Sequence, residues 1–257
     1  MCRFAAYLGP TITLERFLLE PPHSLVRQSY QPREMSTALL NADGFGIGWY
    51  TQERTCVYRN PQPIWSDPNL RGIARSLERP LWLAYVRSAT DELSTHHVNT
   101  QPFCDEELLF LHNGYIDGFA HTLRPRIRSW LDPRIEANVH GSTDSEYLFA
   151  VLRQLLQDED MGIDQALREL CGLVERWAPE CTALLNLAVA DGARIYALRH
   201  AANERCPTLY YTTDDDAYPG AQLLASEPLT EAGFWCAVPD HHLLILDPEE
   251  PPALLPL

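Results

Sequence analysis

The sequence predicts an α+β fold in which two antiparallel sheets carry paired helices on the outside. Short apolar runs rich in β-favouring residues fill both ends of the chain, and two helical patterns lie between them. Strands and helices do not alternate, so a parallel, doubly wound sheet is not expected. Tight turns join consecutive strands, which favours antiparallel pairing. Because there is no low-complexity linker and no fixed-period repeat, residues 2–257 are predicted to form a single domain.

Most predicted strands are short apolar runs bounded by Gly, Pro, Asp or Asn, residues that commonly end strands. The runs cover residues 2–8, 44–50, 81–87 and 107–112 in the first part of the chain, and residues 183–190, 193–199, 208–213, 221–225 and 242–247 in the last part. The Asp-Gly pair at 191–192 lies between two of these runs and therefore predicts a hairpin.

Two central segments have the apolar spacing of amphipathic helices. They cover residues 143–157 and 163–177. The first begins with Thr143, a favourable N-cap residue, and Glu146 follows three positions later in a capping-box pattern. A shorter helix is predicted near residues 119–130, where Pro125 interrupts the pattern.

The composition excludes several kinds of partner. Hydrophobic residues make up 46% of the 257 residues, which is enough to bury a large core. The formal net charge of −15 and the pI of about 4.9 disfavour phosphate backbones and anionic membrane surfaces, so no nucleic acid and no membrane is an expected partner. No run reaches the roughly 18 apolar residues that a membrane span needs.

Cysteine usage and the N-terminal sequence together predict a cytoplasmic protein. The first residues lack the basic and apolar regions of a signal peptide. The chain has 7 cysteines, which are scattered and never form a CxxC pair. An odd, scattered set is typical of reduced thiols in the cytosol, and it predicts no disulfide framework.

Cys2 is the first candidate for chemistry. Methionine is normally removed when the second residue is as small as Cys, and Cys2 would then carry both a thiol and a free α-amine. The unperturbed pKa of that amine, about 7.7–8.0, suits a base near neutral pH. The amine can therefore generate the reactive thiolate of its own residue. From position alone, a buried cysteine at the start of an edge strand is the more common explanation.

Three further motifs place polar groups beside predicted elements. Arg87 and Thr90 follow a strand, and a guanidinium there can bind a carboxylate through two hydrogen bonds. Asn113 and Gly114 follow another strand, and their N–H groups suit an oxyanion hole. Asp144 lies in the first turn of a helix and suits a substrate ammonium group. Each motif also has a simpler explanation. Arg87 could form a surface ion pair, Asn113 and Gly114 could form a hairpin turn, and Asp144 could complement the helix dipole.

The glycine-rich segment at 41–50, AsnAlaAspGlyPheGlyIleGlyTrpTyr, superficially suggests a nucleotide-binding loop. A dinucleotide fingerprint requires a helix after the glycines, whereas an aromatic strand follows here. We therefore reject a nucleotide site and expect these glycines to let the backbone approach a substrate closely. No metal site is predicted, because His96 and His97 are adjacent and no His or Cys pair has zinc spacing.

Taken in order, these segments resemble the class II, or N-terminal nucleophile, glutamine amidotransferase domains. The resemblance runs over about residues 2–150 through MetCysArg, AsnAlaAspGlyPheGly, ValArgSerAlaThr, AsnThrGlnProPhe, HisAsnGly and ThrAspSerGlu. ProProHisSerLeuValArgGlnSerTyrGlnProArg at 21–33 and AlaSerGluProLeu at 225–229 are also similar to the amidohydrolase family of the ergothioneine pathway. With these segments the resemblance spans most of the chain.

The resemblance implies a four-layer αββα sandwich of two antiparallel sheets flanked by helices. It also implies an amidohydrolase that cleaves a γ-glutamyl amide through a thioester on an N-terminal cysteine, with no cofactor. The ergothioneine-pathway family hydrolyses γ-glutamyl-hercynylcysteine sulfoxide to glutamate and hercynylcysteine sulfoxide.

Six residues match the functional positions of the family: Cys2, Arg87, Thr90, Asn113, Gly114 and Asp144. The resemblance implies that the cysteine is the nucleophile and that the Asn-Gly pair forms the oxyanion hole. It further implies that the arginine and threonine hold the glutamyl α-carboxylate, and that the aspartate binds the α-ammonium group.

Two positions depart from the pattern of many amidotransferases. Asp91 stands where many have His, and AsnThrGlnPro at 99–102 replaces AsnxHisPro. We expect both to line the route to the amide donor and to alter glutaminase specificity. Ammonia channelling within this chain is not expected, because the residues after 150 look like the second half of the same sandwich.

Two alternatives remain open at this point: a generic class II glutaminase that feeds a separate partner, and a non-catalytic binding module that retains the fold. The expected partner is a small γ-glutamyl molecule. A homo-oligomer is compatible with the sequence, which has no feature that fixes the oligomeric state.

Overall fold

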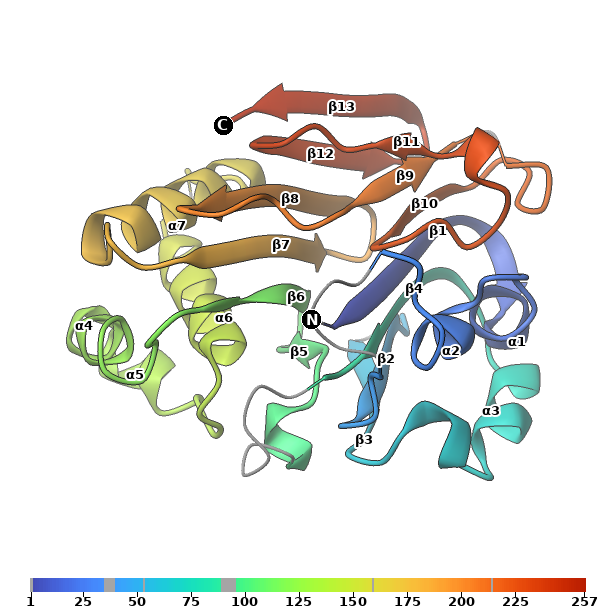
Figure 1. Cartoon of the computed structure of the whole chain (residues 1–257), viewed down its shortest axis with the longest axis horizontal. Helices are drawn as coiled ribbons and strands as arrows, with labels where there is room; N and C mark the ends of the chain where they lie inside the picture. The colour runs from blue at the N-terminus through green and yellow to red at the C-terminus, as the bar shows by residue number, and fades with distance from the viewer. Residues whose placement is uncertain (1, 35–39, 53, 89–95, 159, 214) are drawn as a thin grey trace.

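Two antiparallel sheets lie face to face, and helices cover the outer side of each (Figure 1). The computed structural model describes residues 2–34, 40–52, 54–88, 96–158, 160–213 and 215–257. The predicted Thr90 and Asp91 lie outside this described part of the chain. The four layers confirm the α+β sandwich that the sequence predicts.

The first sheet contains the N-terminal strand. Its strands, in the described residues, are β1 (Arg3–Thr13), β2 (Phe45–Tyr50), β3 (Thr55–Asn60), β4 (Glu78–Val86), β9 (Tyr210–Thr212), β10 (Gln222–Ala225) and β11 (Cys236–Ala237), in the spatial order β11-β9-β10-β1-β4-β2-β3. All neighbours pair antiparallel. On β1, Arg3 pairs with Val86, and Ala5 pairs with Ala225 on the other side. The start of the chain therefore lies in the middle of a sheet.

The second sheet is also antiparallel throughout. Its described strands are β5 (Phe103–Cys104), β6 (Leu109–Ile116), β7 (Ala183–Ala190), β8 (Ile195–Ala202), β12 (His242–Asp247) and β13 (Glu250–Pro256), in the order β13-β12-β8-β7-β6-β5. Ala190 of β7 pairs with Ile195 of β8, which confirms the hairpin predicted at residues 191–192.

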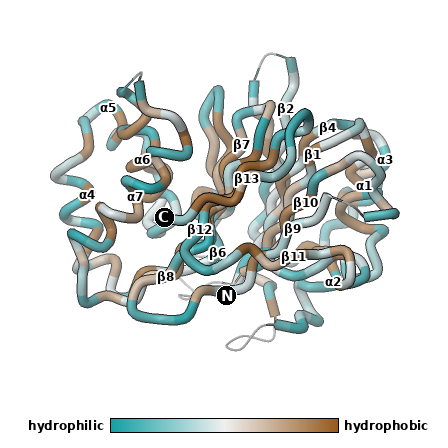
Figure 2. Tube along the Cα trace, turned by 90° about the horizontal axis from the view of Figure 1, so that it is seen from above, coloured by the Kyte–Doolittle hydropathy of each residue, from teal (hydrophilic) through white to brown (hydrophobic). Residues whose placement is uncertain are grey.

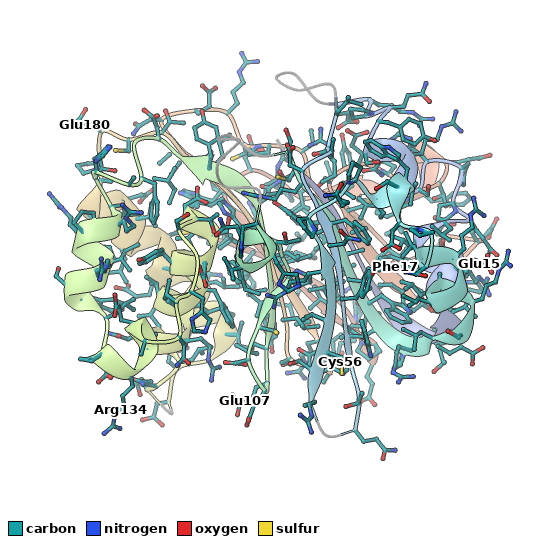
Figure 3. All side chains as sticks on the ribbon, turned by 90° about the horizontal axis from the view of Figure 1, so that it is seen from below. Glu15, Phe17, Cys56, Glu107, Arg134 and Glu180 are labelled. Atoms are coloured by element: carbon teal, nitrogen blue, oxygen red, sulfur yellow. The ribbon has the colours of Figure 1, made fainter. Side chains whose placement is uncertain are left out.

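Helices form the two outer layers, on opposite sides of the strands (Figure 3). Those on the first sheet are α1 (Leu14–Leu18), α2 (Leu25–Gln28) and α3 (Leu70–Ser76), and those on the second are α4 (Arg124–Trp130), α5 (Pro133–Glu136), α6 (Asp144–Leu155) and α7 (Ile163–Trp177). Three short 3₁₀ turns are also described, at Ile64–Ser66, His97–Asn99 and Ala232–Phe234. The two predicted central helices correspond to α6 and α7.

Among the described residues, the core consists of three buried clusters, one between the sheets and one between each sheet and its helices. Figure 2 shows hydrophobic stretches along the strands between the two helical sides. Side chains alternate along β1, so Phe4 and Ala6 face the other sheet whereas Ala5 and Tyr7 face the helices. Cys2 also belongs to the cluster between the sheets.

The sequence pattern does not reveal β3 and β13. Both are edge strands, which have an open side where polar residues and prolines are tolerated and break the apolar run. Pro125 does not interrupt a helix as the sequence suggests. Helix α4 begins at Arg124, and Pro125 occupies its first turn, where the missing N–H removes no helical hydrogen bond.

The glycines of β2 have a different purpose from the predicted one. A Cβ on Gly46 would lie 1.9 Å from the main-chain oxygen of Gln101, and a Cβ on Gly48 would lie 3.0 Å from Leu109. The space beside β2 is therefore filled by the opposite sheet and the segment leading into it. The expectation that these glycines let a substrate approach is wrong, because other residues of the same chain occupy the space beside them.

We predict that Gly46→Ala lowers the free energy of unfolding by about 2 kcal/mol or more, because a main-chain carbonyl cannot move aside as a side chain can. Gly72→Ala in α3 is the matched control. Its new Cβ meets nothing within 4 Å, and alanine should stabilise the helix by about 0.5–1 kcal/mol. Urea unfolding of both variants measures the difference, and equal stability of the two would contradict this packing.

Candidate active site

Cys2 lies just before β1 and is 7% exposed. Its thiol is held between the main-chain groups of Ser88, because the Ser88 N–H donates to Sγ at 3.4 Å and Sγ donates to the Ser88 oxygen at 3.5 Å. Extending the register of β1 and β4 by one residue places Cys2 opposite Arg87. The two residues that the sequence analysis selected from distant motifs are thus neighbours on adjacent strands.

Arg87 follows β4 and is 6% exposed. Its N–H donates to the oxygen of Gly44 at 2.8 Å, and its own oxygen accepts the N–H of Asp43 at 3.0 Å. These two bonds attach the segment before β2 to the end of β4. The main chain of the AsnAlaAspGly motif therefore holds the main chain of Arg87, the candidate carboxylate-binding residue, in place.

Tyr85 connects three of the predicted residues. It is 2% exposed, and Cys2, Asp144 and Arg87 all lie close enough to affect the pKa of its hydroxyl. Burial raises the pKa of Tyr85 well above its usual value, Cys2 and Asp144 raise it further, and Arg87 lowers it. One neutral hydroxyl therefore lies among a thiol, a carboxylate and a guanidinium. The sequence analysis misses Tyr85, although its spacing of two from Arg87 on a strand predicts that both face the same side.

Asn113 and Gly114 lie inside β6, where they pair with Asn186 and Leu185 of β7. The alternative of an Asn-Gly hairpin turn is therefore wrong. Asn113 is completely buried. A Cβ on Gly114 would lie 1.7 Å from the oxygen of Leu184, so only glycine fits this position.

Asp144 begins α6 and is held against the end of β6. Its Oδ2 accepts the N–H of Ile116 at 2.9 Å, and its Oδ1 accepts the N–H of Ser145 at 2.7 Å. The side chain remains 17% exposed, and Oδ1 lies 4.0 Å from Nδ1 of His112. The carboxylate is thus fixed in direction while part of it stays accessible. The helix start next to it uses half of the predicted capping box, since Thr143 Oγ1 accepts the N–H of Glu146 at 3.3 Å.

Gln101 departs from the place that the sequence analysis gives it. Its side chain is 3% exposed and binds the main chain of His112, donating to the oxygen at 3.0 Å and accepting the N–H at 2.6 Å. Both ends of this amide are therefore used inside the second sheet. Gln101 joins the segment before β5 to β6 rather than lining a route to the amide donor.

Glu227 forms a buried polar cluster that the sequence analysis does not identify as functional. Its carboxylate is 1% exposed and binds Arg3 Nε at 2.8 Å and His23 Nε2 at 2.9 Å. It also accepts the main-chain N–H groups of Arg33 at 2.8 Å and Glu34 at 3.1 Å. The two segments that resemble the ergothioneine-pathway family, at 21–33 and 225–229, therefore meet at this carboxylate.

The same cluster reaches the candidate nucleophile. Arg3 Nη1 donates to the main-chain oxygen of Cys2 at 2.8 Å. Burial raises the pKa of the Glu227 carboxyl, but the hydrogen bonds from His23 and from the main chain, together with the charge of Arg3, lower it to about 2. Glu227 therefore stays ionised at neutral pH and holds Arg3 in place beside Cys2.

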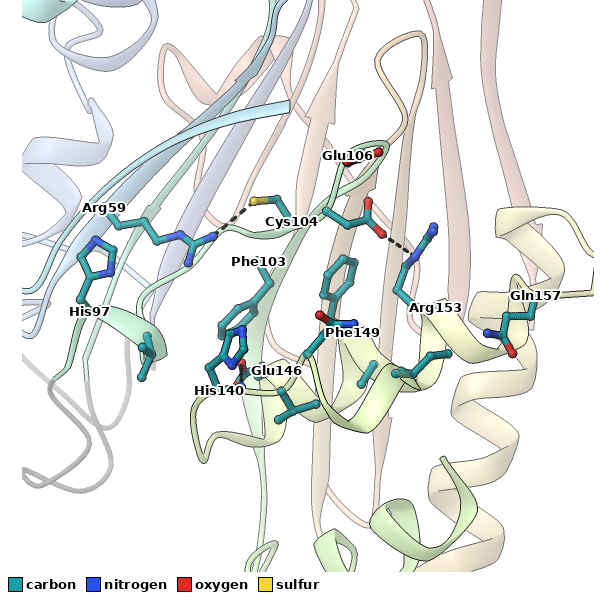
Figure 4. Close-up of a pocket in the computed structure, with 16 residues that line it drawn as sticks. Arg59, His97, Phe103, Cys104, Glu106, His140, Glu146, Phe149, Arg153 and Gln157 are labelled. Atoms are coloured by element: carbon teal, nitrogen blue, oxygen red, sulfur yellow. Dashed lines mark hydrogen bonds and ion pairs between the residues drawn. The ribbon is translucent and has the colours of Figure 1, made fainter. Parts of the chain in front are cut away.

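A cavity of about 620 Å³ lies apart from these residues, between β3, β5 and α6 (Figure 4). Figure 4 shows Arg59 pointing toward Cys104, whose Sγ accepts its Nη2–H at 3.4 Å. On the far wall Arg153 is ion-paired with Asp105 at 2.5 Å. None of the described candidate site residues, Cys2, Arg87, Asn113, Gly114 and Asp144, lines this cavity, so the candidate active site is the group around Cys2.

Neither a metal cluster nor a membrane helix is found in the described ranges. No three His, Cys, Asp or Glu residues among them lie together in a way that could hold a metal ion. Within the same residues, every helix is too short or too polar to cross a membrane.

Comparison with known proteins identifies the family. The sequence family described as class-II glutamine amidotransferases matches residues 22–224. The chain belongs to this family. The class II family comprises N-terminal nucleophile enzymes, and curated relatives are named as hydrolases or amidotransferases. The chain is therefore an amide-hydrolysing enzyme with this fold.

Three relatives illustrate the similarity. The γ-glutamyl-hercynylcysteine sulfoxide hydrolase of Mycobacterium tuberculosis is 32% identical over 244 residues, covering 95% of this chain and 92% of that protein. A probable glutamine amidotransferase of Saccharomyces cerevisiae is 29% identical over 293 residues, covering 96% of this chain and 82% of that protein. The solved structure of a glutamine aminotransferase class-II domain protein from Silicibacter pomeroyi is 26% identical, covers 99% of both chains and has a TM-score of 0.70.

We predict that Glu227→Gln removes a pH-dependent part of the stability. Glu in an unfolded chain titrates near 4.3, so the folded carboxylate should contribute on the order of 3 kcal/mol above that pH. This contribution is lost as the pH falls toward the folded pKa of about 2. In urea unfolding, the stability difference between wild type and variant should therefore shrink as the pH is lowered from neutral.

The exposed Glu169 of α7, which is ion-paired with Arg176, provides the control. Glu169→Gln should change the stability by less than about 1 kcal/mol. A stability difference for Glu227→Gln that stays constant down to about pH 2 would show that the folded carboxylate is not held in its charged form.

Proposed function

We propose that this enzyme hydrolyses γ-glutamyl-hercynylcysteine sulfoxide to glutamate and hercynylcysteine sulfoxide. The similarity to the mycobacterial hydrolases of that name, over nearly the full length of both chains, supports this proposal most strongly. The meeting of segments 21–33 and 225–229 at Glu227 adds support, because these segments carry the resemblance to the ergothioneine-pathway family.

The proposed reaction begins after removal of Met1. The α-amine of Cys2 takes the proton of the thiol, and the thiolate attacks the γ-carbonyl carbon. Asn113 and Gly114 donate hydrogen bonds to the oxyanion of the tetrahedral intermediate. The C–N bond then breaks, and the leaving amine takes the proton held by the Cys2 amine. Water attacks the γ-glutamyl thioester, which releases glutamate and regenerates the thiol.

The charges around Cys2 complement the glutamyl group. Its α-carboxylate would bind Arg87, together with Thr90, and its α-ammonium would bind Asp144. Arg87 is buried and Asp144 is held by main-chain N–H groups, so both charges are in position before the substrate arrives. Preorganised charges lose little energy to rearrangement on binding, which favours a glutamyl donor over a neutral acyl group.

Tyr85 would support the nucleophile. A hydrogen bond donated by its hydroxyl to Cys2 Sγ would stabilise the thiolate that the reaction requires. The tyrosine itself stays protonated, since its pKa is raised well above the usual value.

We predict that Cys2→Ala lowers kcat by a factor on the order of 10⁴ or more, because the acyl acceptor is removed. The fold should remain, since alanine fills most of the same buried space between the sheets. Cys236→Ala is the control, because Cys236 is an exposed free cysteine on β11 and its loss should leave kcat unchanged. Full turnover by the Cys2→Ala protein would exclude the proposed thioester.

A second candidate activity is hydrolysis of glutamine itself. The similarity to a probable glutamine amidotransferase of yeast favours it, at nearly the same level of identity. The two activities differ only in the leaving group, so the glutamyl-binding residues cannot discriminate between them.

We predict that kcat/KM for γ-glutamyl-hercynylcysteine sulfoxide exceeds that for glutamine by about 100-fold or more, which corresponds to about 2.7 kcal/mol of leaving-group recognition. Steady-state assays of released glutamate with both compounds measure this ratio. A ratio below one would replace the proposed substrate with glutamine and leave the nucleophile unaffected.

A further inference from the structure

The residue that follows β10 connects the two sheets at the candidate active site. Ser226 lies next to β1, where its N–H donates to the oxygen of Phe4 at 2.9 Å and its Oγ accepts the N–H of Phe4 at 3.1 Å. From the other sheet, Asn113 Nδ2 lies 3.2 Å from the same Oγ. Ser226 and Asn113 are both completely buried.

The hydrogen bonds of Asn113 are incomplete in this arrangement. Its Oδ1 is buried and has no hydrogen-bond partner among the described residues. An amide oxygen buried without a donor is unfavourable, and an oxyanion hole needs the nitrogen, not the oxygen, to be available. In this arrangement the amide therefore donates from Nδ2 to Ser226 and leaves its acceptor Oδ1 unpaired.

A half-turn of the amide exchanges the roles of its two ends. The hydroxyl of Ser226 has one hydrogen and two lone pairs, and Phe4 uses only a lone pair. The hydrogen is therefore available for Asn113 Oδ1. The oxygen and nitrogen ends of an amide are nearly the same size, so the turn preserves the packing. In the turned state Oδ1 accepts from Ser226, and Nδ2 becomes the end without a protein partner. The oxygen of a bound reacting carbonyl can then accept its hydrogen bond.

We propose that Ser226 is a positioning residue that selects the orientation of the Asn113 amide in which Nδ2 faces the reacting carbonyl. This inference rests on the proposed roles of Cys2 and Asn113. Because the Oγ of Ser226 is itself fixed by Phe4, two residues from Cys2, the same hydroxyl aligns the oxyanion donor with the strand that carries the nucleophile.

The test is a double-mutant cycle between Ser226→Ala and Asn113→Ala. Released glutamate is measured with γ-glutamyl-hercynylcysteine sulfoxide, or with glutamine if the wild type prefers it. Asn113→Ala should lower kcat about 100- to 1,000-fold, the usual effect of removing an oxyanion donor. Ser226→Ala alone should lower kcat about 10-fold or more with KM within about 2-fold of wild type, because the oxyanion exists only in the transition state.

The decisive result is the effect of Ser226→Ala in the Asn113→Ala background. If Ser226 acts by orienting Asn113, the second substitution should lower kcat by less than about 2-fold there. A general structural role would instead give the same loss in both backgrounds, which would overturn the proposal. An unchanged kcat in Ser226→Ala would also overturn it.

If Asn113 is not the oxyanion donor, the kinetics of the variants will differ from the pattern above. Normal kcat in Asn113→Ala would remove Asn113 from the oxyanion hole, and this inference with it, whatever Ser226→Ala does. If Ser226→Ala does not fold, Ser226→Cys provides the second variant, because a thiol fills similar space but donates weakly. It should show the same loss of kcat at unchanged KM, and wild-type kcat in Ser226→Cys would contradict the proposed orientation.

Discussion

The structure around the nucleophile depends on one buried carboxylate. Glu227 binds the side chains of Arg3 and His23 and two main-chain N–H groups of the segment after α2, although Arg3 lies 224 positions away in the sequence. Without it the guanidinium of Arg3 would be a buried charge with no acid to pair with, which is strongly destabilising. Since Arg3 also binds the oxygen of Cys2, this carboxylate fixes the residue that carries the chemistry.

Local pattern predicts the long elements of this fold because each buries a whole face. The apolar run of β1, which is buried on both faces, and the apolar stripe of α7 are examples, and both are visible in the sequence. The edge strands β3 and β13 and the short helices α1, α2, α3 and α5 have too little buried surface to leave a periodic signal. The sequence also does not reveal what fills the space beside Gly46, because the carbonyl of Gln101 comes from the segment that leads into the other sheet.

The residues of the candidate site likewise fall into two groups, those that the sequence indicates and those that only the structure reveals. Cys2, Arg87 and Asp144 can be selected from short motifs, since each has a residue type and a position that suit its chemistry. The roles of Tyr85, Ser226 and Glu227 do not follow from motifs, because they depend on contacts between segments far apart in the chain. Motifs therefore indicate the reacting groups, whereas only the fold shows the groups that orient them.

The central claim is that Cys2, freed of Met1, is the nucleophile. Intact-protein and peptide mass spectrometry, with and without the glutamine-like thiol trap 6-diazo-5-oxo-norleucine, tests it directly. The account predicts a chain that lacks Met1 and carries one adduct, located on Cys2, with loss of activity in proportion to labelling. An active chain that retains Met1, or an active processed chain that is not labelled on Cys2, would contradict it.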